Sequence, residues 1–319
     1  MCKSTLLLNK FVFRFIFIIL FFFSYQIKNS HTQPYIDSSS SVKLSIDSRN
    51  SLSQKENLKI LSWNIYMLPY IGSINSNSSR AESIGEMLSY MDYDIIVFEE
   101  AFHSYSRKII LKELGKMYPF AYGPVNLESN YLETNSGIWI LSKLPLKLIK
   151  SIEYIDSKGF DAIAKKGAVL LEGIWNKKLF QLIGTHLQAD EYSNIRKKQI
   201  NQLYNELVLP YKNDSIPQII CGDFNINAED SFEYFYMIKR LNANNNRSFS
   251  LNNISYDEIN NKIAIKDKPI PKTLDYILIS NETLNVEIER NIIKLQGYNS
   301  DGFREDLSDH YALEANIKF

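Results

Sequence analysis

The chain has 319 residues, of which 45% are hydrophobic and 23% charged, a composition typical of a globular protein with enough chain for a large core. Its 36 basic and 36 acidic residues give a formal net charge of +0. This balance disfavours a protein that binds a polyanion over its whole surface, although it leaves room for a local basic groove. The 20 tyrosines and 18 phenylalanines suit a β-rich protein, and also a surface that meets lipid.

The amino-terminal residues are predicted to lie outside the fold. Lys3, Lys10 and Arg14 precede a dense apolar run, 15–23, and polar residues follow it. A basic segment before a short apolar one is typical of a secretory signal peptide, and this run is shorter than the roughly 20 apolar residues of a spanning helix. We therefore expect residues 1–25 to direct secretion. Because no small-x-small cleavage site follows, a membrane anchor that stays uncleaved is the alternative.

The remaining chain divides into a leader and one catalytic domain. Residues 26–57 are polar and serine-rich without sustained periodicity, and are interpreted as a disordered linker. The catalytic domain is expected to span residues 58–319, since chemistry-bearing motifs are spread over nearly all of it. Cys2 would leave with a signal peptide, and Cys221 alone cannot form an internal disulfide. The mature fold must therefore be held by its core.

Apolar segments of strand length and amphipathic segments of helical length follow one another along this domain. The predicted strands are 58–65, 94–98, 137–141, 146–155, 168–175, 178–185, 217–221, 274–279, 286–293 and 311–317. The predicted helices are a first one capped by Ser78 or Ser79, and then 104–117, 193–208 and 232–241. A tight turn at 176–177 predicts a hairpin, and 242–261 an asparagine-rich loop. Strands dominate, which favours two packed sheets flanked by helices, an α+β fold, over a doubly wound parallel sheet.

Polar residues stand at the ends of several predicted strands, namely Asn64, Glu100, His186, Asp223 and His310. Glu100 comes after an apolar run, so its burial would be costly unless a cation paired with it. Hard divalent cations such as Mg²⁺ prefer oxygen ligands, which makes this residue a candidate metal ligand. The alternatives are an exposed glutamate at a strand end, and a site built on the neighbouring Glu99.

Two further pairs strengthen the prediction of a catalytic site. Asp223 and Asn225 lie two positions apart after a buried strand, which in an extended segment points both side chains to one side; an Asx turn is the structural alternative. Asp309–His310 places a carboxylate beside the side chain best suited to proton transfer near neutral pH. His186 alone is as readily structural as catalytic. The chain has only 4 histidines, and two of them lie near acidic residues at strand ends, which favours a catalytic site.

The ordered segments WNIYMLP, EEAF, GTHLQAD, GDFN, LDYIL and SDHY resemble the endonuclease/exonuclease/phosphatase superfamily over about residues 58–319. More narrowly, the chain is similar to the secreted bacterial neutral sphingomyelinases. The narrower resemblance rests on three segments: 66–69 (YMLP), 186–189 (HLQA), and a loop holding 159–161 (GFD) and 166–167 (KG). Arg80 and Arg196 also stand where related sequences carry arginine.

The resemblance implies a four-layer α/β/β/α sandwich of the DNase-I-like type. It implies Mg²⁺-dependent hydrolysis of sphingomyelin to ceramide and phosphocholine, with Mn²⁺ or Co²⁺ as substitutes. The resemblance further implies a secreted haemolysin or virulence factor that acts by peripheral contact with the outer leaflet of host membranes. No nucleic acid and no obligate protein partner are expected.

The resemblance also assigns metal ligands and groups around the water. It implies that Glu100 binds the principal metal with Asn64 near it, and that Asp309 completes the metal and phosphate pocket. Asp223 and Asn225 would hold a second metal position or orient the water. Whether one or two metals take part stays open at this point.

The other implied roles concern the proton and the substrate. By the resemblance, His186 contacts the phosphate and His310 is the general base, oriented by Asp275. Asp161 and Lys166, five residues apart in the loop, belong to the substrate-facing site. The chemistry of the residues leaves open whether His310 or the carboxylate at 223 takes the proton.

Three departures from the family pattern stand out. The internal disulfide that secreted members often carry is ruled out by the cysteine count. Thr134, Asn135 and Ser104 replace residues of a peripheral metal site, which we expect to be absent or weak. The hairpin before SDHY is short, at 293–307, and offers only two separated aromatic residues, Tyr298 and Phe303.

Two other functions compete with the sphingomyelinase prediction. A nuclease or inositol-phosphate phosphatase of the same superfamily is the first; a nuclease would place Lys and Arg along a groove. The loop with Asp161 and Lys166 argues against it more than the neutral charge does. A non-catalytic membrane-binding protein on the same fold is the second, and it would have no need of the catalytic set.

Overall fold

The structure is a computed structural model that describes residues 55–69, 77–126, 134–244, 254–264, 269–280, 286–298 and 303–319. All of them belong to one compact unit, Leu52–Phe319. The predictions of a signal peptide or anchor at 1–25, of a linker at 26–57 apart from its last three residues, and of a loop through 245–253 concern residues outside these ranges. Among the described residues, none of the helices combines the length and apolarity needed to cross a membrane.

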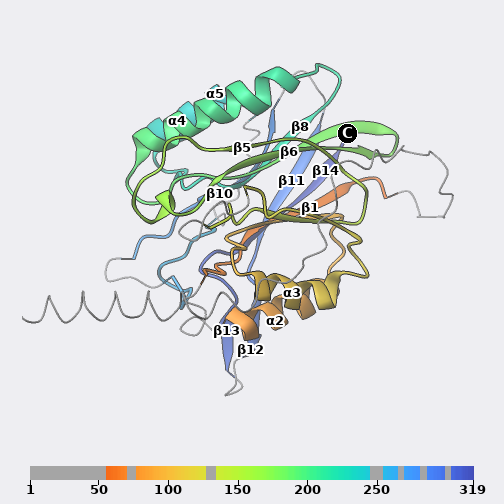
Figure 1. Ribbon diagram of the computed structural model, residues 1–319, viewed down its shortest axis with the longest axis vertical. Coiled ribbons are helices and arrows are strands. Elements are labelled where there is room, and N and C mark those ends of the chain that lie inside the picture. Colours follow the sequence, from red (N-terminus) through yellow and green to blue (C-terminus); the bar gives the residue numbers. More distant parts are fainter. Residues whose placement is uncertain are drawn as a thin grey trace, which may run out of the picture. The chain divides into compact units, whose positions relative to one another are not determined.

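Two six-stranded sheets form the centre of this unit (Figure 1). The first contains, in spatial order, β11 (Glu287–Ile293), β14 (Ala312–Lys318), β1 (Leu58–Asn64), β2 (Ile95–Glu99), β4 (Trp139–Ser142) and β3 (Phe120–Tyr122). The second contains β5 (Lys147–Glu153), β6 (Gly167–Trp175), β7 (Lys178–His186), β8 (Gln218–Asp223), β10 (Asp275–Ser280) and β9 (Ala243–Asn244). A separate small ribbon pairs β12 (Gln296–Tyr298) with β13 (Arg304–Asp306).

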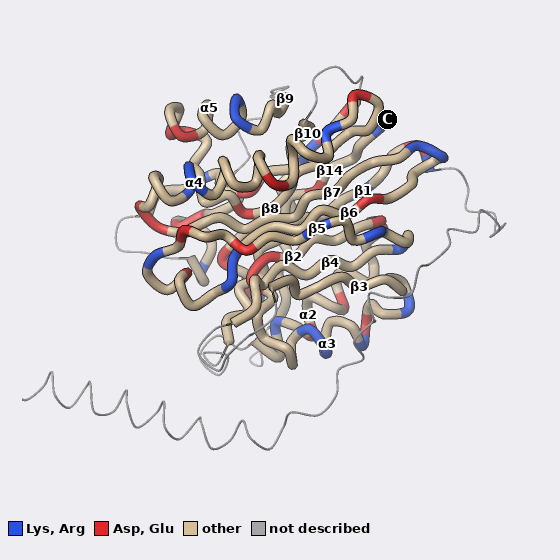
Figure 2. The backbone as a smooth tube through the Cα atoms, turned by 45° about the horizontal axis from the view of Figure 1, so that its top comes forward, with Lys and Arg blue, Asp and Glu red and all other residues tan. Residues whose placement is uncertain are grey.

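Helices cover the outer face of each sheet. The first sheet carries α2 (Asn77–Ser89) and α3 (Ser104–Leu114), and the second carries α4 (Ser193–Leu203) and α5 (Ser231–Arg240). Figure 2 shows the two helix layers on opposite sides of the sheets, with basic and acidic positions interspersed along the described backbone. The predicted four-layer α/β/β/α sandwich, an α+β fold, is confirmed.

Side-chain alternation along the strands divides the interior into three cores. In β1, Leu61 and Trp63 pack against the helices, whereas Leu58 and Ile60 face the other sheet. A strand buried on both faces reads as a nearly continuous apolar run, which is why β1 and β2 were recognisable in the sequence. The third core lies between the second sheet and its helices, around Phe224.

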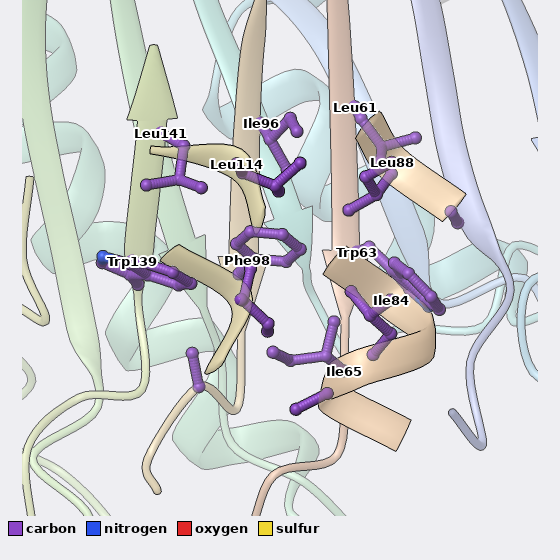
Figure 3. Packing of buried hydrophobic residues seen from close by; sticks show 14 of the residues in the cluster. Leu61, Trp63, Ile65, Ile84, Leu88, Ile96, Phe98, Leu114, Trp139 and Leu141 are labelled. Carbon is purple, nitrogen blue, oxygen red and sulfur yellow. The ribbon is translucent and has the colours of Figure 1, made fainter. Parts of the chain in front are cut away.

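The core under α2 and α3 is organised by large aromatic side chains (Figure 3). The rings of Phe98 and Trp139 stack with centroids 5.3 Å apart, and Ile84 of α2 and Leu114 of α3 belong to the same cluster. Burial of one such side chain contributes about 1.5–3 kcal/mol, so this cluster fixes the strand that ends at Glu99.

Strand direction and register bring the polar strand ends together. The parallel strands β1 and β2 place Asn64 opposite Glu99, and the parallel strands β7 and β8 place His186 opposite Asp223. The antiparallel strand β10 begins beside the end of β8, with Asp275 opposite Asp223. One edge of the sandwich therefore collects residues from both sheets.

Most predicted elements are present, and the differences have local causes. The hairpin turn is confirmed: Trp175 pairs with Lys178, and the two turn residues have φ values of 47° and 67°, as tight hairpins require. The helix predicted over 193–208 ends at Leu203, and a π-helical turn, Tyr204–Val208, and a 3₁₀ turn, Leu209–Tyr211, continue it. Strands β3 and β9 were missed because two or three residues carry no readable periodicity, whereas β12 and β13 form the short hairpin expected at 293–307.

Candidate active site

Asp275 and His310 form a hydrogen-bonded pair between β10 and the segment before β14. Asp275 Oδ2 lies 2.8 Å from His310 Nδ1, and both side chains are buried. Burial alone would lower the pKa of His310, but the charges of Asp275 and Asp223 outweigh it and raise that pKa well above its usual value. Because Nδ1 is held by Asp275, the ring presents Nε2 toward Asp223 Oδ2, 3.7 Å away.

The Asp223 side chain contacts site residues of both sheets. Its Oδ2 accepts a hydrogen bond from Asn64 Nδ2 at 3.1 Å, across the sandwich, and lies 3.4 Å from His186 Nε2. Burial raises the pKa of Asp223 to about 6, against the opposing charge of His310. The predicted residues of both sheets are therefore brought into one cluster.

The Asx turn considered as a structural alternative for Asp223 and Asn225 exists in the fold. Asn225 N–H donates to Asp223 Oδ1 at 2.8 Å, and Asn225 has a left-handed φ of 53°. Even so, the Asn225 side chain reaches the cluster, since its Nδ2 lies 3.2 Å from His186 Nε2. The two residues converge through a turn and not, as predicted, by sharing one side of an extended segment.

His186 is a neutral hydrogen-bond acceptor in this arrangement. Lys166 Nζ, which can only donate, lies 2.9 Å from its Nε2, so the ring proton belongs on Nδ1, which has no partner among the described residues. Burial, followed by the positive charge of Lys166, lowers the pKa of His186 well below its usual value. A neutral His186 holds the Lys166 ammonium in place by accepting its hydrogen bond, and it adds no positive charge to the cluster.

The predicted pair of Asp161 and Lys166 is present and is attached to the cluster. Lys166 Nζ donates to Asp161 Oδ2 at 2.9 Å and to Leu187 O at 3.0 Å, in addition to His186, which uses its three hydrogens. Asp161 Oδ2 also accepts from Ala189 N at 2.7 Å. The loop is therefore joined to the segment that follows β7 by buried, charge-assisted hydrogen bonds.

Glu99 and Glu100 occupy different environments. Glu99 is fully buried between the sheets, where Ser62 Oγ donates to its Oε1 at 2.9 Å, and burial followed by the charge of Asp275 raises its pKa well above the usual value. Glu100 leaves the strand with a left-handed φ of 53°, which turns its side chain elsewhere. Burial, and next the charge of Asp309, raise the pKa of Glu100 to about 7.

The donor set fits a hard divalent cation near Glu100. Its Oε2 is buried without a hydrogen-bond partner among the described residues, a costly state that a cation would relieve. Burial also raises the pKa of Asp309. Ligand atoms of Asp223, Asp275 and His310 lie within 4.8 Å of one another, but the last two are already hydrogen-bonded to each other. The glutamate is therefore the better anchor for the metal.

The two arginines of the family pattern hold loops in place. Arg80 donates to the backbone oxygens of Ile65 and Leu307 at 2.9 and 2.7 Å, which ties the exit of β1 to the segment before His310. Arg196 makes a two-pronged ion pair with Glu233 at 2.8 and 2.9 Å. The charge of Arg80 also acts on Asp309, whose pKa it lowers against the effect of burial, whereas Arg196 holds the scaffold through Glu233.

Two of the residues that stand where other family members have a peripheral metal site, Thr134 and Asn135, brace a turn here. Asn135 Oδ1 accepts from Gly137 N at 2.9 Å, and Thr134 Oγ1 donates to the Asn135 carbonyl. Gly137 has a φ of 73°, and a Cβ there would come within 3.0 Å of the Cα of Glu100. This close approach supports the backbone of Glu100.

Three supporting residues were not singled out from the sequence. Ser308 Oγ donates to the Asn64 carbonyl at 2.6 Å, Trp63 Nε1 donates to the His310 carbonyl at 2.9 Å, and the Tyr256 ring lies 4.9 Å from that of His310. Trp63 and Ser308 fall inside motifs that were recognised, so their positions carried a signal. Tyr256 lies within the predicted asparagine-rich loop, 242–261, and carried none.

Comparison with known proteins places this geometry in context. The chain is 32% identical over 311 residues to a Leptospira interrogans protein named sphingomyelinase C 2, covering 84% of this chain and 48% of the relative. It is 28% identical to sphingomyelinase C of Bacillus cereus, covering 86% of this chain and 92% of that one. The chain thus spans about half the length of the leptospiral relatives it matches.

A solved structure shares the fold. A Staphylococcus aureus beta toxin mutant with bound magnesium ions superposes with a TM-score of 0.68 at 24% identity, covering 81% of this chain and 99% of that one. The family model described as the endonuclease/exonuclease/phosphatase family matches residues 61–310, from the middle of β1 to the histidine paired with Asp275. The chain therefore belongs to the endonuclease/exonuclease/phosphatase family.

Proposed function

We propose that this chain is a metal-dependent sphingomyelin phosphodiesterase that releases phosphocholine and leaves ceramide. The observation that carries the proposal is the hydrogen-bonded set of Asp161, Lys166 and His186. This set joins the loop on which the resemblance to sphingomyelinases rests to the rest of the candidate active site. The names of the Leptospira and Bacillus relatives support the substrate. Secretion, and action on the outer leaflet of a host membrane, are part of the same proposal.

The reaction needs one new bond and one broken bond. A water oxygen attacks phosphorus, the bond between phosphorus and the ceramide oxygen breaks, and the proton lost by the water ends on that oxygen. His310 Nε2 and Asp223 Oδ2 face each other at 3.7 Å, too far for either to satisfy the other. One of them can accept the proton of the attacking water while the other, already protonated, gives its own proton to the leaving oxygen, and a proton passed between them afterwards restores the starting state.

The remaining residues orient the reacting groups. Asp275 fixes the His310 tautomer by accepting from Nδ1, and Asn64 holds Asp223 from the opposite sheet. Lys166 uses its three hydrogens on Asp161, Leu187 O and His186, so it would act on the phosphate through its positive charge and not as a direct donor. A charge fixed before the substrate arrives needs no reorganisation as charge develops.

Glu100, with Asn64 and Asp309, would hold the metal, for which we propose Mg²⁺ with Mn²⁺ or Co²⁺ as substitutes. When bound, such an ion neutralises charge on the phosphate and lowers the pKa of a coordinated water. The buried, unpartnered oxygen of Glu100 supports this assignment. The bound magnesium ions of the staphylococcal relative support the choice of metal.

The test is release of phosphocholine from sphingomyelin vesicles in Mg²⁺ and in EDTA, with phosphatidylcholine vesicles and plasmid DNA in parallel. Mg²⁺-dependent release from sphingomyelin, with DNA left intact, is the expected result. Nicking of DNA without phosphocholine release would keep the metal site and overturn the substrate. Binding to vesicles with no hydrolysis of either sphingomyelin vesicles or detergent-dispersed sphingomyelin would favour the non-catalytic alternative.

A further inference from the structure

The loop 155–165, between β5 and β6, displays large apolar side chains to solvent. Phe160 is 90% exposed, Ile155 84% and Ile163 47%. Phe160 lies in a 3₁₀ turn, Gly159–Ala162, in which none of the residues is buried. Single exposed apolar residues are ordinary, but three from one short loop make that loop a candidate for contact with a partner or an apolar phase.

The polar groups of this loop are bonded inward. Lys158 N–H donates to Gln188 Oε1 at 2.8 Å, and Gln188 Nε2 donates back to the Lys158 carbonyl at 3.1 Å. Thr134 N–H donates to the Ile163 carbonyl at 3.0 Å, and Tyr154 N–H closes the base of the loop on the Lys166 carbonyl at 2.9 Å. The backbone is thus anchored from two sides, and the exposed apolar side chains are held away from the core.

The loop also borders the reacting groups directly. Phe160 immediately precedes Asp161, whose carboxylate accepts from Lys166, and that lysine lies 2.9 Å from His186. The ring of Tyr192 adds an apolar surface beside the loop, since a Cβ on Gly159 would lie 3.8 Å from it. An apolar phase that met Phe160 would therefore stand at the rim of the site.

We propose that loop 155–165 is the surface by which this protein docks on a phospholipid bilayer, with Phe160 and Ile163 entering the interfacial layer. The inference rests on the proposed function, because a substrate whose acyl chains stay in a bilayer must be met at the membrane surface. The exposed Lys158 beside Phe160 suits the headgroup layer, where cationic and aromatic side chains are favoured together. Docking here would bring a headgroup to Lys166 without extraction of the whole lipid.

The experiment compares the double variant Phe160→Ala/Ile163→Ala with the unchanged chain. Co-sedimentation with sphingomyelin and cholesterol vesicles is measured in EDTA, so that hydrolysis does not alter the surface. Removing two apolar side chains from the interface is expected to weaken partitioning roughly tenfold or more. The matched control is Tyr90→Ala, because Tyr90 is 83% exposed just after the end of α2, and it should bind as the unchanged chain does.

Hydrolysis assays separate docking from chemistry. The double variant should lose phosphocholine release from vesicles while keeping release from detergent-dispersed sphingomyelin within about twofold of the unchanged chain, since neither side chain touches the reacting groups. Equal vesicle binding by the double variant and the unchanged chain would overturn the docking proposal. So would a loss confined to Tyr298→Ala/Phe303→Ala, which would place the contact on the β12–β13 ribbon.

Failure of the proposed function has its own signature. An unchanged chain that hydrolyses neither vesicles nor dispersed sphingomyelin would reject the substrate assignment, whereas the sedimentation comparison would still decide the docking surface. If the loop meets a protein in place of lipid, neither the unchanged chain nor the variant should sediment with vesicles. That result also overturns the proposal.

Discussion

Replacing Asp275 with asparagine should separate catalysis from stability. The carboxylate accepts from His310 Nδ1 at 2.8 Å, and its charge is a main cause of the raised pKa of that imidazole. An amide keeps the shape but removes the charge, so His310 loses both its fixed tautomer and its affinity for a proton. Positioned proton transfer contributes about 10²–10⁴-fold, and we expect kcat for dispersed sphingomyelin to fall by that factor.

The stability of Asp275→Asn should change little, for reasons visible in the same cluster. The lost charge-assisted bond is worth about 1.5–3 kcal/mol, but the amide retains part of it. The lost charge also stops repelling Glu99 and Asp223, whose pKa values it helps to raise. We expect a net change within about 1 kcal/mol, or a shift in Tm of about 2–4 °C for a domain of this size.

Asp306→Asn is the matched control. Asp306 is as buried as Asp275, but it accepts from Gln296 Nε2 at 2.9 Å and from Lys262 N–H at 3.1 Å, away from the cluster. Its amide would point a donor at one of these donors, at a cost of about 1–3 kcal/mol, while kcat stays within a few-fold. Near-normal turnover by the Asp275 variant, or an equal loss in both variants, would refute the reasoning.

Three other predictions concern the metal, pH and the scaffold. Glu100→Gln should weaken Mg²⁺ binding at least about tenfold in calorimetric titration, and unchanged affinity would move the metal elsewhere. Since the folded pKa of Glu100 is about 7 against 4.5, its ionisation destabilises the metal-free fold as pH rises from 4.5 to 7. In EDTA, the free energy of unfolding of the Gln variant should therefore rise relative to that of the unchanged chain across this window, by at most about 3 kcal/mol, and its Tm should rise with it. A difference that stays constant with pH would contradict the raised pKa. Arg196→Met should lose about 3–5 kcal/mol in urea unfolding by stranding Glu233, with KM for dispersed substrate little changed; the reverse pattern would give Arg196 a direct role.

The layered fold was predictable because its strands are buried on one or both faces. Runs such as 95–98 are apolar throughout, and the amphipathic pattern around Ile84 and Leu88 marks α2. Convergence of the strand ends followed from the same argument once two packed sheets were expected. What composition and spacing could not give was the pairing of segments far apart in the chain.

The choice between Glu99 and Glu100 shows where sequence reasoning stops. Both follow the same apolar run, but Glu99 ends between the sheets, whereas the left-handed φ of 53° at Glu100 turns that carboxylate away from them. That turn depends on close packing against Gly137, which is distant in sequence. The contribution of Tyr256 was unreadable for the same reason, since its ring meets His310 through a loop without periodicity.

The bonds from Trp63 to the His310 carbonyl and from Ser308 to the Asn64 carbonyl join the first strand to the last segment of the chain. β14 is inserted between β11 and β1, so the first sheet stays open until it arrives. A chain made from its amino end thus holds the five strands that end or begin at the other site residues (β1, β2, β7, β8 and β10) before it holds His310 or β14. Such contacts form late because of their sequence separation. The site and the continuous first sheet therefore depend on the same final segment of the chain, and neither is complete before residues 308–318 are in place.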